Sequence, residues 1–129
     1  LCSREVIPAM KRKGWGRIIN FSSQLAHKGA PQMVHYCAAK AAVMGFSRSL
    51  AYELVEHGIT VNSINPGPID TPLYMSIPED WRRDKEASMP IKRPGRVEEV
   101  VPTVLLLASD EGSFYVGASM NMNGGDVMV

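Results

Sequence analysis

The 129-residue sequence has no long apolar run and no strong excess of charge of either sign. Its longest apolar run, residues 104–108, falls far short of the roughly 20 residues that a membrane-spanning helix needs. Lys and Arg number 14 against 13 Asp and Glu, so the chain lacks the basic surface of a nucleic-acid-binding protein. We therefore expect neither a membrane nor a nucleic acid as a partner.

Cysteine is also scarce. Cys2 and Cys37 show no metal-ligand spacing, and no secretory leader is recognisable, which indicates a reducing, cytoplasmic setting and no metal site. A serine hydrolase is disfavoured because the chain has no G-x-S-x-G elbow, although it contains His27, His35 and His57. Internal repeats and a G-x-G-x-x-G phosphate loop are absent as well.

What is present is a regular succession of apolar patterns. Apolar residues at helical spacing predict helices over residues 1–13, 36–57 and 97–109, and a short helix is expected near residues 79–88. Short apolar or β-branched runs predict strands over residues 17–22 and 59–64, and a last short strand is expected over residues 119–123. Residues 72–95 are polar and interrupted by prolines, which predicts an excursion that contains the short third helix. The alternation of strand and helix predicts an α/β fold with parallel strands and helices on both faces of the sheet.

Tyr36 and Lys40 begin the longest predicted helix. Residues four apart lie on one helical face, about one turn from each other, so these two side chains can act together. A phenol ordinarily loses its proton at about pH 10, and a neighbouring ammonium favours the phenolate, as proton exchange at neutral pH requires. The alternative interpretation is an ordinary tyrosine and lysine on a helix surface.

Two further segments follow predicted strands, where parallel sheets place their ligands. Ser23 ends the first strand and could bind a substrate oxygen, although it could also satisfy its own backbone, and Ser22 competes for the role. Residues 65–71 follow the second strand, and their two prolines and one glycine suit the edge of a flat ring such as a nicotinamide. The alternative is a turn in which Asp70 or Thr71 caps the next helix.

Over essentially its whole length the sequence resembles the classical short-chain dehydrogenase/reductase family. The resembling segments are GRIINFSS (16–23), YCAAK (36–40), AAVMGFSRSLAYEL (41–54), GITVNSINPGPIDT (58–71), RPGRVEEV (93–100), LLASDE (106–111) and NGG (123–125). The resemblance implies that Tyr36 is the general acid/base, that Ser23 polarises the substrate carbonyl, and that Lys40 assists Tyr36 and binds the cofactor ribose. It also implies the cofactor-binding residues, namely Tyr36, Lys40, Pro66, Gly67, Pro68, Ile69 and Thr71, with the Ile69 backbone and the Thr71 hydroxyl on the carboxamide.

The same resemblance implies an NAD- or NADP-dependent oxidoreductase that transfers a hydride to or from an alcohol or carbonyl substrate, similar to 3-oxoacyl reductases or to sugar and polyol dehydrogenases. It further implies a cytoplasmic homo-oligomer, a dimer or a homotetramer. Residues 1–129 would form one partial domain, the C-terminal part of a doubly wound Rossmann-type fold whose N-terminal dinucleotide-binding half is absent.

The departures from the family lie in that half. Its glycine-rich loop, its residue that selects NAD or NADP, its Asn-Ala-Gly segment and its catalytic Asn have no counterpart and would precede Leu1. We therefore expect this chain alone to be inactive and to bind dinucleotides very weakly. The alternative function is a truncated, non-catalytic assembly or binding module, which would not need Ser23, Tyr36 and Lys40 together.

Overall fold

Three parallel strands form one sheet in the computed structural model, which describes residues 2–129. The strands are β1 (Gly16–Phe21), β2 (Ile59–Ile64) and β3 (Ser119–Met120), and β2 lies between the other two. The β1–β2 register runs from Gly16 opposite Ile59 to Phe21 opposite Ile64. Every residue of β2 is buried, as expected for a central strand that is covered on both faces.

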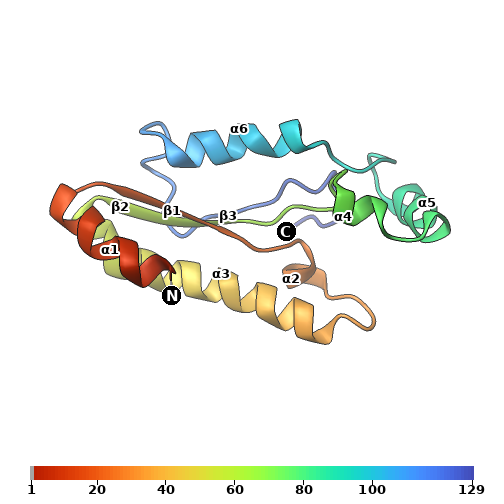
Figure 1. The fold of residues 1–129 in the computed structure, drawn as a ribbon, viewed down its shortest axis with the longest axis horizontal. Coiled ribbons are helices and arrows are strands. Elements are labelled where there is room, and N and C mark those ends of the chain that lie inside the picture. Colours follow the sequence, from red (N-terminus) through yellow and green to blue (C-terminus); the bar gives the residue numbers. More distant parts are fainter. Residues whose placement is uncertain (1) are drawn as a thin grey trace.

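Helices cover both faces of this sheet, which confirms the predicted α/β class. On one face lie α1 (Cys2–Lys13) and α3 (Val34–Leu54), and on the other lies α6 (Val97–Ala108) (Figure 1). A 3-10 turn, Val55–His57, extends α3 and ends at Gly58, whose φ of 71° is the left-handed conformation typical of a glycine at a helix end.

Each face has its own hydrophobic cluster because side chains alternate along a strand. The cluster under α3 contains Ile18, Ala51, Leu54, Ile59 and Val61. The cluster under α6 contains Ile64, Val100 and Leu107, with Ile19 and Met120 packed against it. The two clusters hold the strands in one register, so the positions of the strand ends are fixed.

The structure differs from the sequence predictions mainly in short elements and in element ends. The predicted helix over 36–57 starts earlier, at Val34, and the predicted strand over 119–123 is paired only at Ser119–Met120. The one-turn helix α2 (Leu25–Lys28) was not predicted, and α4 (Pro72–Met75) was expected only as a helix of unstated bounds after an Asp70 or Thr71 cap, because four residues are too few to show a helical period. Leu1, at the start of the first predicted helix, lies outside the described residues.

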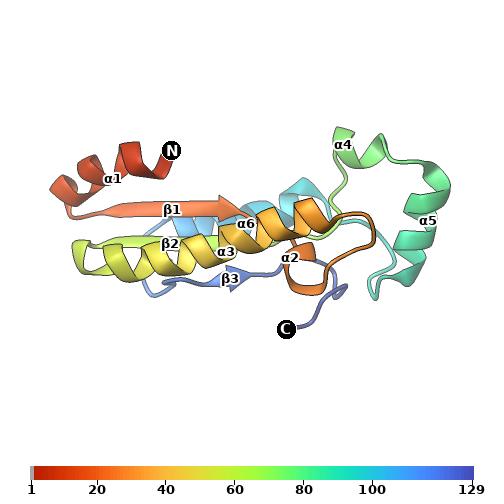
Figure 2. The same ribbon diagram turned by 90° about the horizontal axis from the view of Figure 1, so that it is seen from below.

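The predicted excursion lies beyond the carboxyl ends of the strands. It carries α4 and α5 (Glu79–Ser88) and occupies the same end of the sheet as α2 (Figure 2). Thr71 is the N-cap of α4, because its Oγ1 accepts a hydrogen bond from the Tyr74 N–H at 3.2 Å, as one interpretation of the sequence predicted. Within residues 2–129, no helix combines the length and the apolar character needed to cross a membrane.

Tyr74 joins the two helices of the excursion and has an unusual titration. Burial and a 2.9 Å hydrogen bond from its hydroxyl to Glu86 Oε1 raise the pKa of Tyr74 to about 12. Because this folded-state pKa lies above the ordinary tyrosine value, the interaction stabilises the fold fully below about pH 10 and is lost as the pH rises toward 12. In an alkaline absorbance titration of the intact protein, Tyr74→Phe should remove the latest tyrosine step. Loss of a step near the ordinary value instead would contradict this assignment.

Candidate active site

The carboxyl ends of β1 and β2 bring the predicted chemical residues to one edge of the sheet. β1 leads directly into Ser22 and Ser23, and β2 leads directly into Asn65 and Pro66. The two segments are held together, since the Ser22 N–H donates to the Ile64 carbonyl at 2.8 Å and the Gln24 N–H donates to the Pro66 carbonyl at 3.1 Å. The sequence-based expectation that both segments share one sheet edge is therefore met.

Tyr36 and Lys40 lie on the first two turns of α3, as the four-residue spacing predicted. The Lys40 Nζ lies over the Tyr36 ring, 5.7 Å from its centroid, and donates a hydrogen bond to the Phe21 carbonyl at 2.9 Å. This distance is within the range of a cation–π contact. The anchored ammonium is thus held by the end of β1 beside the tyrosine, while two of its three hydrogens are left for other partners.

The tyrosine hydroxyl is available for a substrate. Tyr36 is half-buried, and its hydroxyl forms no hydrogen bond within residues 2–129. A hydroxyl without a protein partner keeps its proton and its acceptor sites for another molecule.

Ser22 and Ser23 differ in what their hydroxyl groups do. The Ser22 hydroxyl donates its proton to the Lys40 carbonyl at 2.7 Å, which ties β1 to α3. The Ser23 Oγ accepts a hydrogen bond from the Leu25 N–H at 3.2 Å, so its own proton remains free to donate. In the described part of the chain no hydrogen bond joins Ser23 to Tyr36 directly. The geometry favours Ser23 over Ser22 as the substrate contact.

The loop after β2 is braced by backbone hydrogen bonds. Gly67 N–H donates to the Met122 carbonyl at 3.0 Å, and residues on both sides of Ile69 bond to Gly95: the Gly95 N–H donates to Pro68 and the Gly95 carbonyl accepts from Asp70. The N–H and C=O of Ile69 itself take no part in this bridge and are turned away from Gly95. They are the backbone groups that the family resemblance assigns to a carboxamide.

Packing also requires a glycine at position 67, in addition to the close approach of a flat ring that the sequence suggests. A Cβ added there would lie 2.9 Å from the Asn123 Cα and 3.1 Å from the Gln24 Oε1. Since the Asn123 backbone cannot move without disturbing the segment after β3, any side chain at this position would displace the loop. The loop can therefore keep its position only with glycine at 67.

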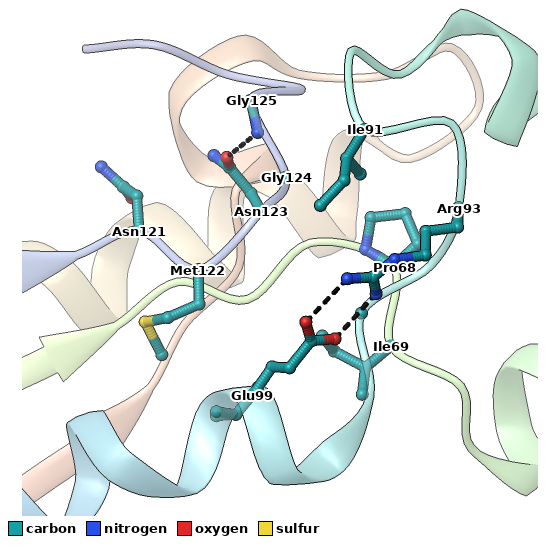
Figure 3. Close-up of a pocket in the computed structure, with 12 residues that line it drawn as sticks. Pro68, Ile69, Ile91, Arg93, Glu99, Asn121, Met122, Asn123, Gly124 and Gly125 are labelled. Atoms are coloured by element: carbon teal, nitrogen blue, oxygen red, sulfur yellow. Dashed lines mark hydrogen bonds and ion pairs between the residues drawn. The ribbon is translucent and has the colours of Figure 1, made fainter.

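A cavity of about 270 Å³ adjoins this loop on the side of the excursion (Figure 3). Its walls include Pro68 and Ile69, and Arg93 binds Glu99 there through two hydrogen bonds of 2.8 and 2.7 Å. These bonds, together with one from the Arg96 N–H, lower the pKa of Glu99 to about 2. The cavity is separate from the three predicted catalytic residues, because Ser23, Tyr36 and Lys40 do not line it.

The residues 2–129 contain no group of three His, Cys, Asp or Glu side chains close enough to hold a metal ion. Sequence reasoning missed one charged cluster near the site, made by Gln24, Lys28, Lys85 and Asp126. No sequence signal could have found it, because Gln24 and Asp126 are 102 positions apart and neither belongs to a periodic pattern.

Comparison with known proteins supports the resemblance found in the sequence. A family profile described as Enoyl-(Acyl carrier protein) reductase matches residues 1–126. Nodulation protein G of Azospirillum brasilense is 46% identical over 123 residues, which are 95% of this chain and 50% of that protein. The 3-oxoacyl-(acyl-carrier-protein) reductase FabG of Salmonella typhimurium is 41% identical over 127 residues, covering 98% and 52% of the two chains.

Two further relatives extend the comparison. The acetoacetyl-CoA reductase of Cupriavidus necator is 39% identical over 123 residues, covering 95% of this chain and 50% of that one. The crystal structure of a 3-oxoacyl-(acyl-carrier protein) reductase from Brucella melitensis superposes with a TM-score of 0.92 at 34% identity, covering 98% of this chain and 47% of that chain. The chain thus has the Rossmann-type fold of that reductase and spans about half the length of the relatives that it matches.

Proposed function

This chain belongs to the short-chain dehydrogenase/reductase family, and on that premise we propose that it carries the proton-transfer site of an NAD- or NADP-dependent reductase of 3-oxoacyl thioesters. One observation carries the proposal: the Lys40 ammonium is bonded to the end of β1 and held over the Tyr36 ring, beside a tyrosine hydroxyl without a protein partner within residues 2–129. A surface tyrosine and lysine would not need this anchor.

Three side chains divide the work on the substrate carbonyl. Ser23 donates its free hydroxyl proton to the carbonyl oxygen and so polarises the C=O bond. Tyr36 transfers its phenolic proton to that oxygen as negative charge develops on it, which turns the carbonyl into a hydroxyl. Lys40 favours the phenolate that remains, because its positive charge is fixed next to the ring.

The residues present also fit a nicotinamide nucleotide, which when bound in reduced form supplies the hydride to the carbonyl carbon. Lys40 has two hydrogens left for the hydroxyl groups of the ribose. Ile69 offers a backbone N–H and C=O outside the Gly95 bridge for the carboxamide, and the Thr71 hydroxyl keeps a proton to donate while its oxygen caps α4. Pro66, Gly67 and Pro68 would form the edge along which the ring lies.

The substrate class comes from what the relatives have in common. Two of them are named for 3-oxoacyl groups on acyl carrier protein and for acetoacetyl-CoA, and both molecules carry a ketone two bonds from a thioester carbonyl. Nothing in the described structure favours a sugar or polyol over this class.

We also propose a homo-oligomer in a reducing compartment, as the family resemblance implies. Large apolar side chains are exposed on both helical layers, among them Phe46 and Tyr52 on α3 and Leu105 on α6, and their burial between subunits would stabilise an assembly. Cys2 and Cys37 are free thiols in the structure, which suits a reducing compartment.

The function is tested with the intact protein by following the absorbance of NADPH and NADH in the presence of acetoacetyl-CoA, crotonyl-CoA or a polyol. We expect consumption of reduced nicotinamide with acetoacetyl-CoA and formation of the 3-hydroxy product, and the preferred nucleotide is identified in the same assay. Activity on crotonyl-CoA alone would make the protein an enoyl reductase, as the profile description reads. Activity on polyols alone, or on none of these compounds, would overturn the proposal and favour a dehydrogenase of another class or a non-catalytic module.

A further inference from the structure

Three segments that are far apart in the sequence converge on one carboxylate oxygen. Asp126 Oδ2 accepts hydrogen bonds from Gln24 Nε2 at 2.5 Å, from Lys28 Nζ at 2.9 Å and from Lys85 Nζ at 2.6 Å. We call these four side chains the Asp126 junction. Its members come from residues 24–28 after β1, which include α2, from α5 and from the segment after β3.

The Asp126 junction is a buried charge cluster. The side chains of Asp126 and Lys85 are 7% and 16% exposed, and that of Lys28 is 34% exposed. Burial alone would raise the pKa of Asp126, but the hydrogen bonds and charges of Lys85 and Lys28 outweigh it, so its pKa lies below the usual range. The carboxylate is therefore charged at neutral pH, and removing it would leave two ammonium groups facing each other without a counter-charge.

The junction lies between the two segments that would enclose a substrate. Gln24 directly follows Ser23, and Lys28 ends the short helix that comes next. Lys85 lies on α5 in the excursion beyond the carboxyl ends of the strands (Figure 2). A single carboxylate therefore links the segment that carries Ser23 to the excursion.

The position of α5 depends on such links because the helix has no core packing of its own. None of the residues of α5 is buried, so hydrophobic burial contributes little to where it sits. The hydrogen bond from the Tyr74 hydroxyl to Glu86 joins α5 only to α4, which belongs to the same excursion. In contrast, the turn that carries Asp126 is braced within itself, because the Asn123 side chain donates to the Val127 carbonyl and accepts from the Gly125 N–H.

We propose that Asp126 is a positioning residue that holds α5 against the Ser23 segment and thereby shapes the substrate side of the active site. The proposal rests on the proposed function. It assigns Asp126 no contact with the substrate, the nucleotide or the reacting atoms. Its effect passes through Lys85 to the excursion and through Gln24 and Lys28 to the segment after Ser23.

The first test uses Asp126→Asn in the intact protein. Asparagine keeps the size of the side chain and an oxygen acceptor for Gln24, but it removes the charge that binds both lysines. We expect the KM for acetoacetyl-CoA to rise about tenfold, with a kcat change of a few fold at most and an unchanged KM for the nicotinamide nucleotide. Asp126→Glu keeps the negative charge, so its KM for acetoacetyl-CoA should lie close to the wild-type value.

Asp110→Asn is the matched control. Asp110 also accepts two hydrogen bonds, from Trp15 Nε1 at 2.8 Å and from Arg17 at 3.3 Å, but it lies by the amino end of β1, away from the excursion. Its loss should leave both KM values and kcat unchanged. If Asp126→Asn raises the KM for substrate and for nucleotide equally, or lowers only thermal stability, Asp126 is merely structural and the proposal is overturned.

The second test needs no activity, so it separates this proposal from the proposed function. Trypsin can cut α5 after Arg82 or Arg83, and cleavage there should become about tenfold faster in Asp126→Asn than in the wild type or Asp110→Asn. In Asp126→Ala, added acetate should slow the cleavage again, because a small carboxylate can occupy the space between the lysines. Unchanged cleavage rates would overturn the proposal even in an active reductase, and faster cleavage would support it even if acetoacetyl-CoA is not reduced.

Discussion

Replacing Tyr36 by phenylalanine is expected to lower the turnover of 3-oxoacyl thioesters by about 100-fold or more. The change removes only the hydroxyl, which has no hydrogen-bond partner within residues 2–129, so no internal contact is lost with it. The ring stays in place under the Lys40 ammonium, and the anchor of Lys40 on the Phe21 carbonyl is untouched. The loss should therefore appear in kcat, with the binding of the nicotinamide nucleotide nearly unchanged.

Lys40→Met separates the two roles of the tyrosine and lysine pair. It keeps the apolar stem but removes the charge next to the ring and the donor hydrogens proposed for the ribose. Steady-state kinetics should then show lower turnover together with weaker nucleotide binding, a combination that Tyr36→Phe should not show. Wild-type turnover in Tyr36→Phe would remove this tyrosine from the mechanism.

Gly58→Ala is expected to destabilise the intact protein by about 3 kcal/mol or more. Gly58 has a φ of 71°, which costs any other residue about 1 to 2 kcal/mol. In addition, a Cβ at this position would overlap the Gly14 carbonyl oxygen of the α1–β1 turn. That turn is next to the start of the sheet, where the Gly16 N–H donates to the Gly58 carbonyl at 3.3 Å, so a displacement there would disturb the first β1–β2 pair.

Gly14→Ala provides the matched control, since Gly14 has a similar φ of 66° but no heavy atom within 4 Å of an added Cβ. It should cost only the conformational term of about 1 to 2 kcal/mol. Denaturant unfolding gives the free energy of unfolding of both variants, and the difference between their losses is the cost of the overlap at Gly58. Equal losses of stability in the two variants would contradict the close contact between position 58 and the Gly14 carbonyl oxygen.

The candidate site was predictable from the sequence wherever its geometry is local. Tyr36 and Lys40 are neighbours because they are four residues apart on one helix, and any chain that forms that helix places them so. Ser23 and the loop from Pro66 reach one edge because both follow strands of a parallel sheet, whose carboxyl ends point the same way. The alternating pattern that located β2 at its observed bounds is local in the same sense.

Tertiary contacts decided what these local patterns left open. Local pattern does not distinguish the hydroxyl of Ser22 from that of Ser23, and only the approach of the Lys40 carbonyl engages the proton of Ser22 and leaves that of Ser23 free. The glycine at 67 is explained in part by Asn123, which the sequence places far along the chain.

The Asp126 junction is the clearest case of this kind. Local propensity and hydrophobic period act over a few residues, whereas Gln24 and Asp126 meet across 102 positions only after the sheet has brought β1 and β3 to the two sides of β2. The sequence alone therefore determined the longer helices, the strands β1 and β2, and the pair of residues at the start of α3. Which charges become buried together was determined by packing, because burial makes an unpaired charge costly and so selects the arrangement in which both lysines share one carboxylate.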